Sequence, residues 1–267
     1  MSFLDALDPR YRVILCDVWG VVHDGVRLYS GAAQRLQDWR SDGRCVCLIT
    51  NAPRTALAVE RQLARIGLPR DAYDFVSTSG EAGIAALNRL ARPIGFVGTA
   101  EDRVILEGRG VRITDDEDFS ELACTGVMEG RPQPTDYRLD LERWAQRDVV
   151  MHCLNPDRMV VRGGEIEACA GAITDLYLEL GGRVTWYGKP HKAIYSHALG
   201  RAGNPPKTNV LAVGDGLQTD MLGAAQIGID AVFVTGGVHA GEPFPGDFAA
   251  SHGLGDWRPV ALVEDLA

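Results

Sequence analysis

The sequence of 267 residues has no apolar run that approaches the roughly 20 residues of a membrane-spanning helix. It also lacks a basic excess, because 27 Lys and Arg stand against 36 Asp and Glu and give a net charge of -9. An acidic balance argues against general nucleic-acid binding and against docking on anionic membranes. We therefore expect neither nucleic acid nor a membrane as a partner, while a small anionic substrate stays compatible with the composition.

No C-x-x-C pair occurs among the six cysteines, which lie mostly within apolar runs. Reduced, buried thiols explain this pattern best, and a thiolate metal site is the alternative. The first segment, MSFLDALDPRYR, carries charges where a secretory signal has its apolar region. Together these features predict a cytoplasmic protein.

Several catalytic and cofactor motifs are also missing. The chain has no G-x-S-x-G elbow, no H-E-x-x-H zinc motif and no Walker-type phosphate loop. The segment Gly214-Asp215-Gly216 lacks the third glycine of a dinucleotide fingerprint, and its aspartate would face the pyrophosphate. A nicotinamide or flavin cofactor is therefore not expected.

What the chain does have is a series of short apolar runs rich in Val, Ile and Leu. Each run is followed by Gly, Asp or Thr and then by a helical pattern, and runs that are apolar on both faces suit strands covered on both sides. This alternation predicts an α/β fold with a mostly parallel sheet and helices on its faces. The expected strands are 12–17, 45–50, 94–98, 148–154, 183–188, 209–215 and 230–236, and the clearest helices are 54–67, 80–91 and 191–202.

The middle of the chain is less regular. Residues 114–123 (TDDEDFSELA) form a dense acidic cluster, which we interpret as a solvated surface rather than a metal site, and residues 131–134 (RPQP) form a loop. The length fits one α/β unit with an insertion or two modest domains. We expect an inserted α/β domain at 80–180 within a core of 1–79 and 181–267.

Polar residues stand at the ends of four apolar runs. Ligands of a doubly wound sheet bind beyond the carboxyl ends of its strands, so we expect these residues to form one site. Oxygen ligands without clustered His or Cys suit Mg²⁺ and a phosphate group, and a carboxylate at the focus could attack phosphorus while the cation and a lysine offset the charge repulsion. The residues are Asp17, Thr50 with Asn51, Lys189, and Asp215 with Asp220.

The order Asp17, Thr50-Asn51, Gly188-Lys189-Pro190 and Gly214-Asp215-x-x-x-x-Asp220 resembles the haloacid dehalogenase-like hydrolase superfamily. It is most similar to the subclass IIA phosphatases, which include nucleotide, sugar-phosphate and nitrophenyl-phosphate phosphatases. The resemblance covers most of the chain, is weakest at 99–147, and implies a Rossmann-like core with an inserted α/β cap. Supporting phrases are LITNAPR (48–54), LNPDRMV (154–160), YGKPHKAIY (187–195) and LAVGDGLQTDMLGAAQIGI (211–229).

The resemblance also implies a role for each core residue of the site. Asp17 resembles the nucleophile and a Mg²⁺ ligand, while Lys189 would orient it and neutralise the transferring group. Phosphoryl oxygens would be bound by Thr50, Asn51 and Ala52.

The metal set and the cap residues are implied in the same way. The carbonyl of Trp19 and the carboxylate of Asp215 would complete the metal set with Asp17, and Asp220 would bind through water or support Asp215 and Lys189. In the cap, Asn155-Pro156-Asp157 resembles a motif at the substrate entrance, although a turn joining two strands explains it equally well.

The chain departs from the family at Trp19, where the family usually has a second aspartate that serves as general acid and base. That help is typically worth about 10²–10⁴-fold in rate, and an indole cannot transfer a proton. His23, Asp24 or His191 could substitute, the enzyme could be slow or prefer acyl and aryl phosphates, or the chain could be an inactive Mg²⁺- and phosphate-binding module. Another reaction of the same carboxylate is the remaining alternative.

We expect a Mg²⁺-dependent phosphatase (a phosphoric monoester hydrolase) that acts on a small phosphorylated metabolite through an aspartyl-phosphate on Asp17. The cap would choose the substrate and close over the core. A homo-oligomer formed through the cap is left open.

Overall fold

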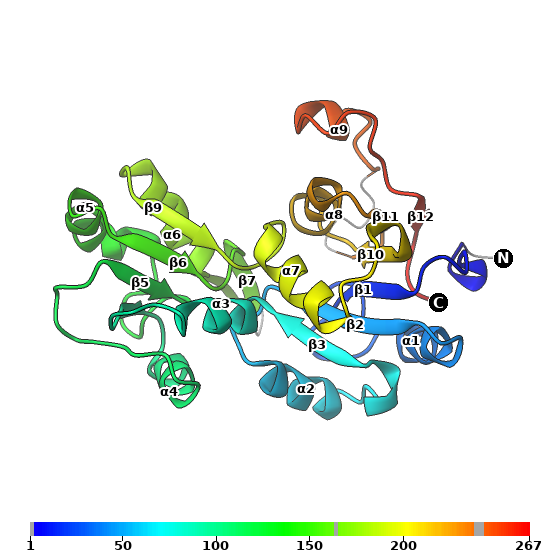
Figure 1. Cartoon of the computed structure of the whole chain (residues 1–267), viewed down its shortest axis with the longest axis horizontal. Coiled ribbons are helices and arrows are strands. Elements are labelled where there is room, and N and C mark those ends of the chain that lie inside the picture. Colours follow the sequence, from blue (N-terminus) through cyan, green and yellow to red (C-terminus); the bar gives the residue numbers. More distant parts are fainter. Residues whose placement is uncertain (1–2, 163–164, 238–242) are drawn as a thin grey trace. The chain divides into compact units, whose positions relative to one another are not determined.

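The structure, a computed structural model, describes residues 3–162, 165–237 and 243–267. Strands alternate with helices along most of this length (Figure 1). The predicted α/β class with a mostly parallel sheet is confirmed. Within the described ranges, every helix is too short or too polar to cross a membrane.

Two compact units make up the chain. The first contains residues 1–50, 56–77 and 189–267, and the second contains residues 51–55 and 78–188. Each unit has its own sheet and its own buried apolar cluster. The short segment 51–55 is separated in sequence from the rest of the second unit. It directly follows Thr50, and it contains the predicted site residues Asn51 and Ala52.

The first unit is built on a six-stranded sheet with the order β12-β11-β10-β1-β2-β3. β1 pairs in parallel with β10 on one side and with β2 on the other. Chain order therefore reverses between β10 and β1, which is where open α/β sheets bind their ligands. The strands are β1 (Val13–Asp17), β2 (Cys45–Thr50), β3 (Phe75–Thr78), β10 (Val210–Gly214), β11 (Asp230–Val234) and β12 (Ala261–Val263).

Helices and single turns accompany this sheet. The α-helices are α1 (Ala32–Ser41), α2 (Ala56–Arg65), α7 (Lys192–Arg201), α8 (Leu222–Ile227) and α9 (Phe248–Ser251). The other helical elements are η1 (Phe3–Ala6), η2 (Arg70–Ala72), η4 (Lys207–Asn209) and the π-helical turn η5 (Leu217–Met221).

The central strands of the first sheet are buried on both faces. Val13 and Leu15 of β1 lie in one apolar cluster with residues of α7 and α8. Ile14 and Cys16 point to the opposite face, because successive side chains of a strand alternate, and both are fully buried. Burial on both faces explains why the run VILC contains no alternating polar residue.

The second unit contains a four-stranded parallel sheet, in the order β4-β5-β6-β9, and a separate antiparallel hairpin of β7 and β8. Its strands are β4 (Gly95–Val97), β5 (Glu121–Cys124), β6 (Val150–Cys153), β7 (Met159–Arg162), β8 (Glu165–Ala168) and β9 (Arg183–Trp186). Its helices are α3 (Ser79–Leu87), α4 (Ala100–Gly108), the turn η3 (Pro134–Tyr137), α5 (Arg138–Gln146) and α6 (Ala170–Glu179).

The observed units differ from the expected division in two places. β9 pairs with β6 in the second unit, whereas a boundary at residue 180 would place it in the core. Residues 51–55 also group with the second unit. The apolar pattern of a strand does not reveal which sheet it joins, so neither assignment was visible in the sequence.

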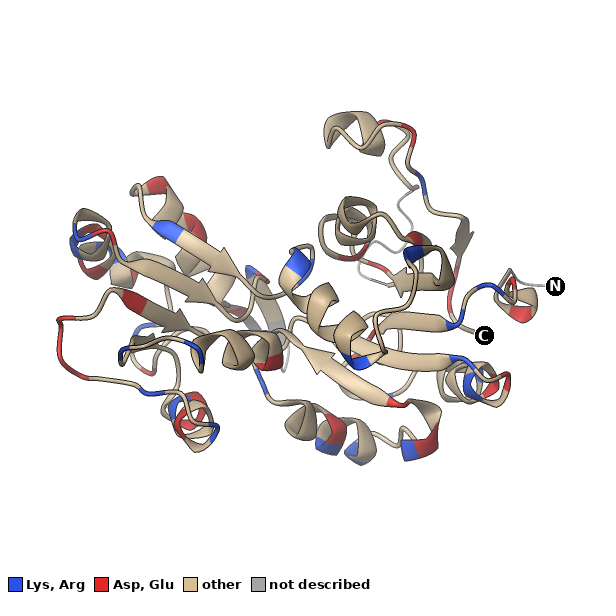
Figure 2. Ribbon diagram, in the orientation of Figure 1, with Lys and Arg blue, Asp and Glu red and all other residues tan. Residues whose placement is uncertain are grey.

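The acidic segment combines surface ion pairs with the start of a strand. Asp115 pairs with Arg103 at 2.6 Å and Glu117 pairs with Arg143 at 3.2 Å, all on the surface. β5 begins at the end of this segment and is buried from its second residue on. Figure 2 shows Lys, Arg, Asp and Glu gathered mainly on helices and loops, with few on the strands of either sheet.

Two leucines of α5 provide a test of this packing. Leu141 is fully buried in the core of the second unit, whereas Leu139 is 80% exposed. Leu141→Ala should lower the free energy of unfolding by about 2–5 kcal/mol because it leaves a cavity, while Leu139→Ala should change it by less than about 0.5 kcal/mol. Urea unfolding followed by intrinsic fluorescence measures both, and equal effects would contradict the described orientation of α5.

Candidate functional site

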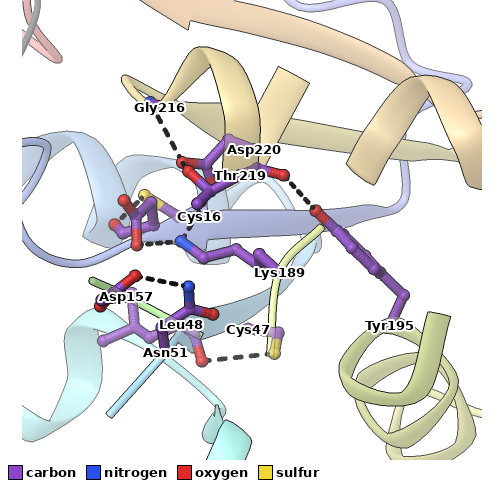
Figure 3. Close-up of polar contacts among 11 residues, drawn as sticks. Cys16, Cys47, Leu48, Asn51, Asp157, Lys189, Tyr195, Gly216, Thr219 and Asp220 are labelled. Carbon is purple, nitrogen blue, oxygen red and sulfur yellow. Dashed lines mark hydrogen bonds and ion pairs between the residues drawn. The ribbon is translucent and has the colours of Figure 1, made fainter. Parts of the chain in front are cut away.

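A buried ion-pair group joins three of the predicted site residues. The Lys189 ammonium donates to Asp17 Oδ1 at 2.5 Å and to Asp220 Oδ1 at 2.9 Å (Figure 3). None of the three residues is more than 7% exposed. Because burying an ion costs several kcal/mol unless it is paired, this group indicates a built site rather than a chance surface contact.

The sheet topology brings a third carboxylate to the same place. Asp17 is the last residue of β1, and Asp215 directly follows β10, the parallel neighbour of β1. Carboxylate oxygens of Asp17, Asp215 and Asp220 all lie within 4.8 Å of one another. The structure therefore gathers Asp17, Lys189, Asp215 and Asp220 at one edge of the first sheet.

Asp220 is fixed by the π-helical turn η5. Its Oδ2 accepts hydrogen bonds from the Gly216 N–H at 3.2 Å and the Thr219 hydroxyl at 3.3 Å, while its Oδ1 accepts from Lys189 (Figure 3). Both oxygens of Asp220 are thus engaged by hydrogen-bond donors. This arrangement suits the support of Lys189 better than direct binding of a metal, and π-helical turns recur at functional sites.

Two glycines make room for the carboxylate of Asp215. A Cβ atom on Gly20 would lie 2.0 Å from Asp215 Oδ2, and a Cβ atom on Gly237 would lie equally close. Gly20 has a φ of +85°, which other residues rarely adopt, so its backbone conformation adds a second requirement for glycine. Gly237 was not among the predicted site residues, and its place just beyond β11 was the signal that could have found it.

Burial shapes the charge of the cluster. It raises the pKa of Asp17 to about 6 and that of Asp220 to about 7. Burial also opposes the charged form of Lys189, but Asp17 and Asp220 together hold the pKa of this lysine above its usual value. The site therefore contains a stable ammonium next to carboxylates that lack full hydration.

A divalent cation fits this group. Asp17 and Asp215 offer carboxylates to it, whereas Asp220 adds a third carboxylate that Lys189 engages, and Lys189 adds one positive charge. The neighbouring thiol of Cys16 is buried, which raises its pKa and keeps it protonated, so this thiol does not compete as a soft ligand. Oxygen donors alone suit hard cations such as Mg²⁺ or Ca²⁺.

The predicted phosphate-binding residues lie at the end of the adjacent strand. Thr50 is the last residue of β2, which pairs with β1 so that Ile49 stands opposite Asp17. Asn51 and Ala52 follow and group with the second unit. Their predicted contact with a phosphate stays a prediction.

The predicted cap residues contact one another and Asn51 within the second unit. The Asn51 side-chain amide donates to Asp157 Oδ1 at 2.8 Å, and the Asp157 backbone N–H donates to Asn155 Oδ1 at 3.2 Å. Asn51, Asn155 and Asp157 thus form one hydrogen-bonded group. A contact of Asn155 or Asp157 with substrate also stays a prediction.

Trp19 lies in the loop that follows β1, two residues after Asp17. Its indole is 39% exposed and meets the ring of His23 edge-on at 5.5 Å between centroids. Gly25, with a φ of +95°, accommodates the indole, because a Cβ atom there would lie 2.3 Å from it. The indole is therefore held in place, and metal binding by the Trp19 carbonyl stays a prediction.

The three residues suggested as substitutes for the missing acid all have lowered pKa values. His23 is buried, which lowers its pKa, and its Nδ1 accepts the Gly25 N–H at 2.8 Å. Burial also lowers the pKa of His191. The Asp24 carboxylate accepts the N–H groups of Arg27 and Val26, and these bonds lower its pKa. All three shifts disfavour the protonated form that a general acid needs.

Comparison with known proteins gives consistent matches. A haloacid dehalogenase-like hydrolase family model matches residues 14–112, and a second hydrolase model of the same kind matches residues 186–267. The ribonucleotide monophosphatase NagD of Escherichia coli is 30% identical over 232 residues, which cover 84% of this chain and 88% of that protein.

Solved structures agree with the sequence matches. A hydrolase of the haloacid dehalogenase-like family from Brucella suis is 36% identical, with a TM-score of 0.84 over 99% of this chain and 98% of that one. A glycerol phosphate phosphatase from Mycobacterium tuberculosis, solved in complex with magnesium, is 23% identical with a TM-score of 0.74 over 96% of this chain and 76% of that one, and it shows a shared fold only. On the strength of the 30% and 36% identical matches, the chain belongs to the haloacid dehalogenase-like hydrolase family.

Proposed function

We propose that this hydrolase is a Mg²⁺-dependent phosphatase that removes the phosphate of a small phosphorylated metabolite, with Asp17 as nucleophile. The observation that carries the proposal is the buried Asp17 carboxylate, held by Lys189 beside two further carboxylates. The relative named as a ribonucleotide monophosphatase supports a small organic phosphate as the substrate class.

Mg²⁺ would be held by Asp17, Asp215 and the carbonyl of Trp19, with Asp220 supporting the set through Lys189. When bound, the cation supplies positive charge next to the phosphoryl oxygens and so favours approach of the anionic substrate. Gly20 and Gly237 would help to hold the cation indirectly, because they leave room for the Asp215 carboxylate.

The protein's residues then carry out a two-step displacement. An oxygen of Asp17 attacks phosphorus, the bond from phosphorus to the leaving oxygen breaks, and an aspartyl-phosphate forms. In the second step water attacks that phosphorus, the bond between phosphorus and the Asp17 oxygen breaks, and inorganic phosphate and a proton are released as the Asp17 carboxylate is restored. Lys189 keeps its proton throughout, orients Asp17 and offsets negative charge on the phosphoryl group.

Thr50, Asn51 and Ala52 would bind phosphoryl oxygens, and the second unit would act as the cap that selects the leaving group. Trp19 cannot protonate that leaving group, and the pKa shifts of its neighbours do not compensate. The enzyme should therefore favour acyl and aryl phosphates, which leave without a proton. Trp19 also motivates the alternative of an inactive module that binds Mg²⁺ and a phosphorylated ligand.

Replacement of the nucleophile tests the reaction itself. Asp17→Asn should abolish hydrolysis of 4-nitrophenyl phosphate, and it should also abolish the mass increase of one phosphoryl group that acetyl phosphate produces in the quenched wild-type protein.

EDTA should stop wild-type turnover, and excess Mg²⁺ should restore it. Asp38→Asn, on the exposed surface of α1, is the matched control and should retain activity. Binding of Mg²⁺ and phosphate without turnover of any aryl, acyl or alkyl phosphate would favour the inactive module.

Restoring an acid at position 19 tests the leaving-group argument. Trp19→Asp should raise kcat/KM for an alkyl phosphate by about 10²-fold or more and change the value for 4-nitrophenyl phosphate much less. Trp19→Phe, which adds no acid, should leave the ratio of the two values near that of the wild type. If Trp19→Asp does not shift the ratio, another group already supplies the proton.

The glycine beside Asp215 allows a test of cation binding that does not alter a carboxylate. Gly237→Ala should weaken Mg²⁺ binding by at least about tenfold, because its Cβ would lie 2.0 Å from Asp215 Oδ2. Gly246→Ala is the control, since its Cβ would meet no atom within 4 Å. Isothermal titration with MgCl₂ measures both variants, and unchanged affinity in Gly237→Ala would remove Asp215 from the metal set.

A further inference from the structure

Within the second unit, residues 51–55 are held by hydrogen bonds to Asp157 and to the start of α3. The Asn51 side-chain amide donates to Asp157 Oδ1 at 2.8 Å. The Gly80 N–H donates to the Ala52 carbonyl at 3.1 Å, and the Thr78 hydroxyl donates to the Arg54 carbonyl at 2.6 Å. The segment that follows Thr50 is therefore held along its length by the start of α3 and by Asp157.

Close packing reinforces these bonds at two glycines. A Cβ atom on Gly80 would lie 2.1 Å from the Pro53 carbonyl oxygen, so only glycine lets α3 approach the segment this closely. A Cβ atom on Gly188 would lie 2.5 Å from Asn51 Oδ1 and 2.4 Å from Pro156 Cδ. Asn51 and Pro53 thus pack closely against Gly188 and Gly80 of the second unit.

Asp157 lies in the loop between β6 and β7 and is held against the first turn of α6. Its backbone N–H donates to Asn155 Oδ1 at 3.2 Å, and its carbonyl accepts the Gly171 N–H at 3.1 Å. A Cβ atom on Gly171 would lie 2.2 Å from the Pro156 carbonyl oxygen, so the turn packs directly on the helix. Asp157 therefore presents its carboxylate to Asn51 from a fixed backbone (Figure 3).

The charge of Asp157 argues against direct contact with a phosphate. A carboxylate that faced a phosphoryl group would repel it, whereas a carboxylate that accepts a hydrogen bond from Asn51 orders that residue instead. The sequence resemblance grouped Asp157 with the substrate-binding residues. Its hydrogen bond with Asn51 instead suits a role in orienting that residue.

We propose that Asp157 is a positioning residue, which fixes Asn51 and thereby sets the phosphate-binding segment without touching the substrate. The proposal rests on the proposed function for the role of Asn51 as a phosphate-binding residue. It makes the affinity for phosphate depend on the second unit, because the segment that follows Thr50 is built into that unit. The cap would then contribute to phosphate binding as well as to selection of the leaving group.

The experiment compares four single variants, and the double variant of Asn51→Ala with Asp157→Ala, in phosphate binding, hydrolysis and thermal stability. Asp157→Ala removes the acceptor, Asp157→Asn keeps an oxygen that can accept from Asn51, and Asn51→Ala removes the donor. Asp175→Ala is the matched control, because Asp175 is also a partly buried carboxylate of the second unit but accepts from Arg158 instead. Isothermal titration with inorganic phosphate in the presence of Mg²⁺ gives the Kd, and hydrolysis of 4-nitrophenyl phosphate gives KM and kcat.

Asp157→Ala should raise both the phosphate Kd and KM by about tenfold, the size expected for one lost hydrogen bond to a charged group. Its kcat should fall by less than about threefold, because the lost interaction serves ground state and transition state alike. Asp157→Asn should regain most of the lost affinity, and Asp157→Ala should add little in the Asn51→Ala background. Asp175→Ala should match the wild type.

Three results in the variants would overturn the proposal. They are an unchanged phosphate Kd in Asp157→Ala, an Asp157→Asn variant as weak as Asp157→Ala, and additive effects of the Asn51 and Asp157 changes. A loss of thermal stability with normal phosphate affinity would likewise show a merely structural role. If the variants alter phosphate binding as expected but the wild type hydrolyses nothing, the positioning role stands and the proposed catalytic function fails. A wild type that binds no phosphate would overturn both.

Discussion

The contact between the Lys189 ammonium and the carboxylates of Asp17 and Asp220 is the interaction on which the rest of the site depends. Taking three ionised groups out of water is costly, and mutual pairing offsets that cost only when the geometry is good. Here the lysine reaches both carboxylates at hydrogen-bond distance. The pairing allows the Asp17 carboxylate to be buried and still charged, as the proposed attack on a phosphate would require.

Several features of the surrounding backbone place the charged groups of this contact. The reversal of strand order between β10 and β1 brings Asp17 and Asp215 to one edge. The π-helical turn η5 directs Asp220 back toward Lys189, and Gly20 lets the chain pass close to Asp215. The π-helical turn and the positive φ of Gly20 depart from regular local geometry, and such departures gather at functional sites.

Much of this could be predicted from the sequence, because strand ends in a doubly wound sheet share an edge. The apolar runs predicted the central strands, and the polar residue after each run predicted Asp17, Thr50 and Asp215 as neighbours. Close approach of backbones was not visible, so the role of Gly237 was missed. Membership of β9 and of residues 51–55 in the second unit was also hidden, since strand pairing depends on contacts far apart in sequence.

The family membership and the buried cluster lead to one central claim: Asp17 faces a bound Mg²⁺ and the phosphorus of the substrate at the same time. A crystal structure determined with Mg²⁺ and orthovanadate, a mimic of the transferring phosphoryl group, tests this most directly. The account predicts Mg²⁺ bound by Asp17 and Asp215, with vanadium next to the other oxygen of Asp17 and Lys189 in contact with the anion. Mg²⁺ or vanadate bound elsewhere, with Asp17 and Lys189 paired only to each other, would contradict it.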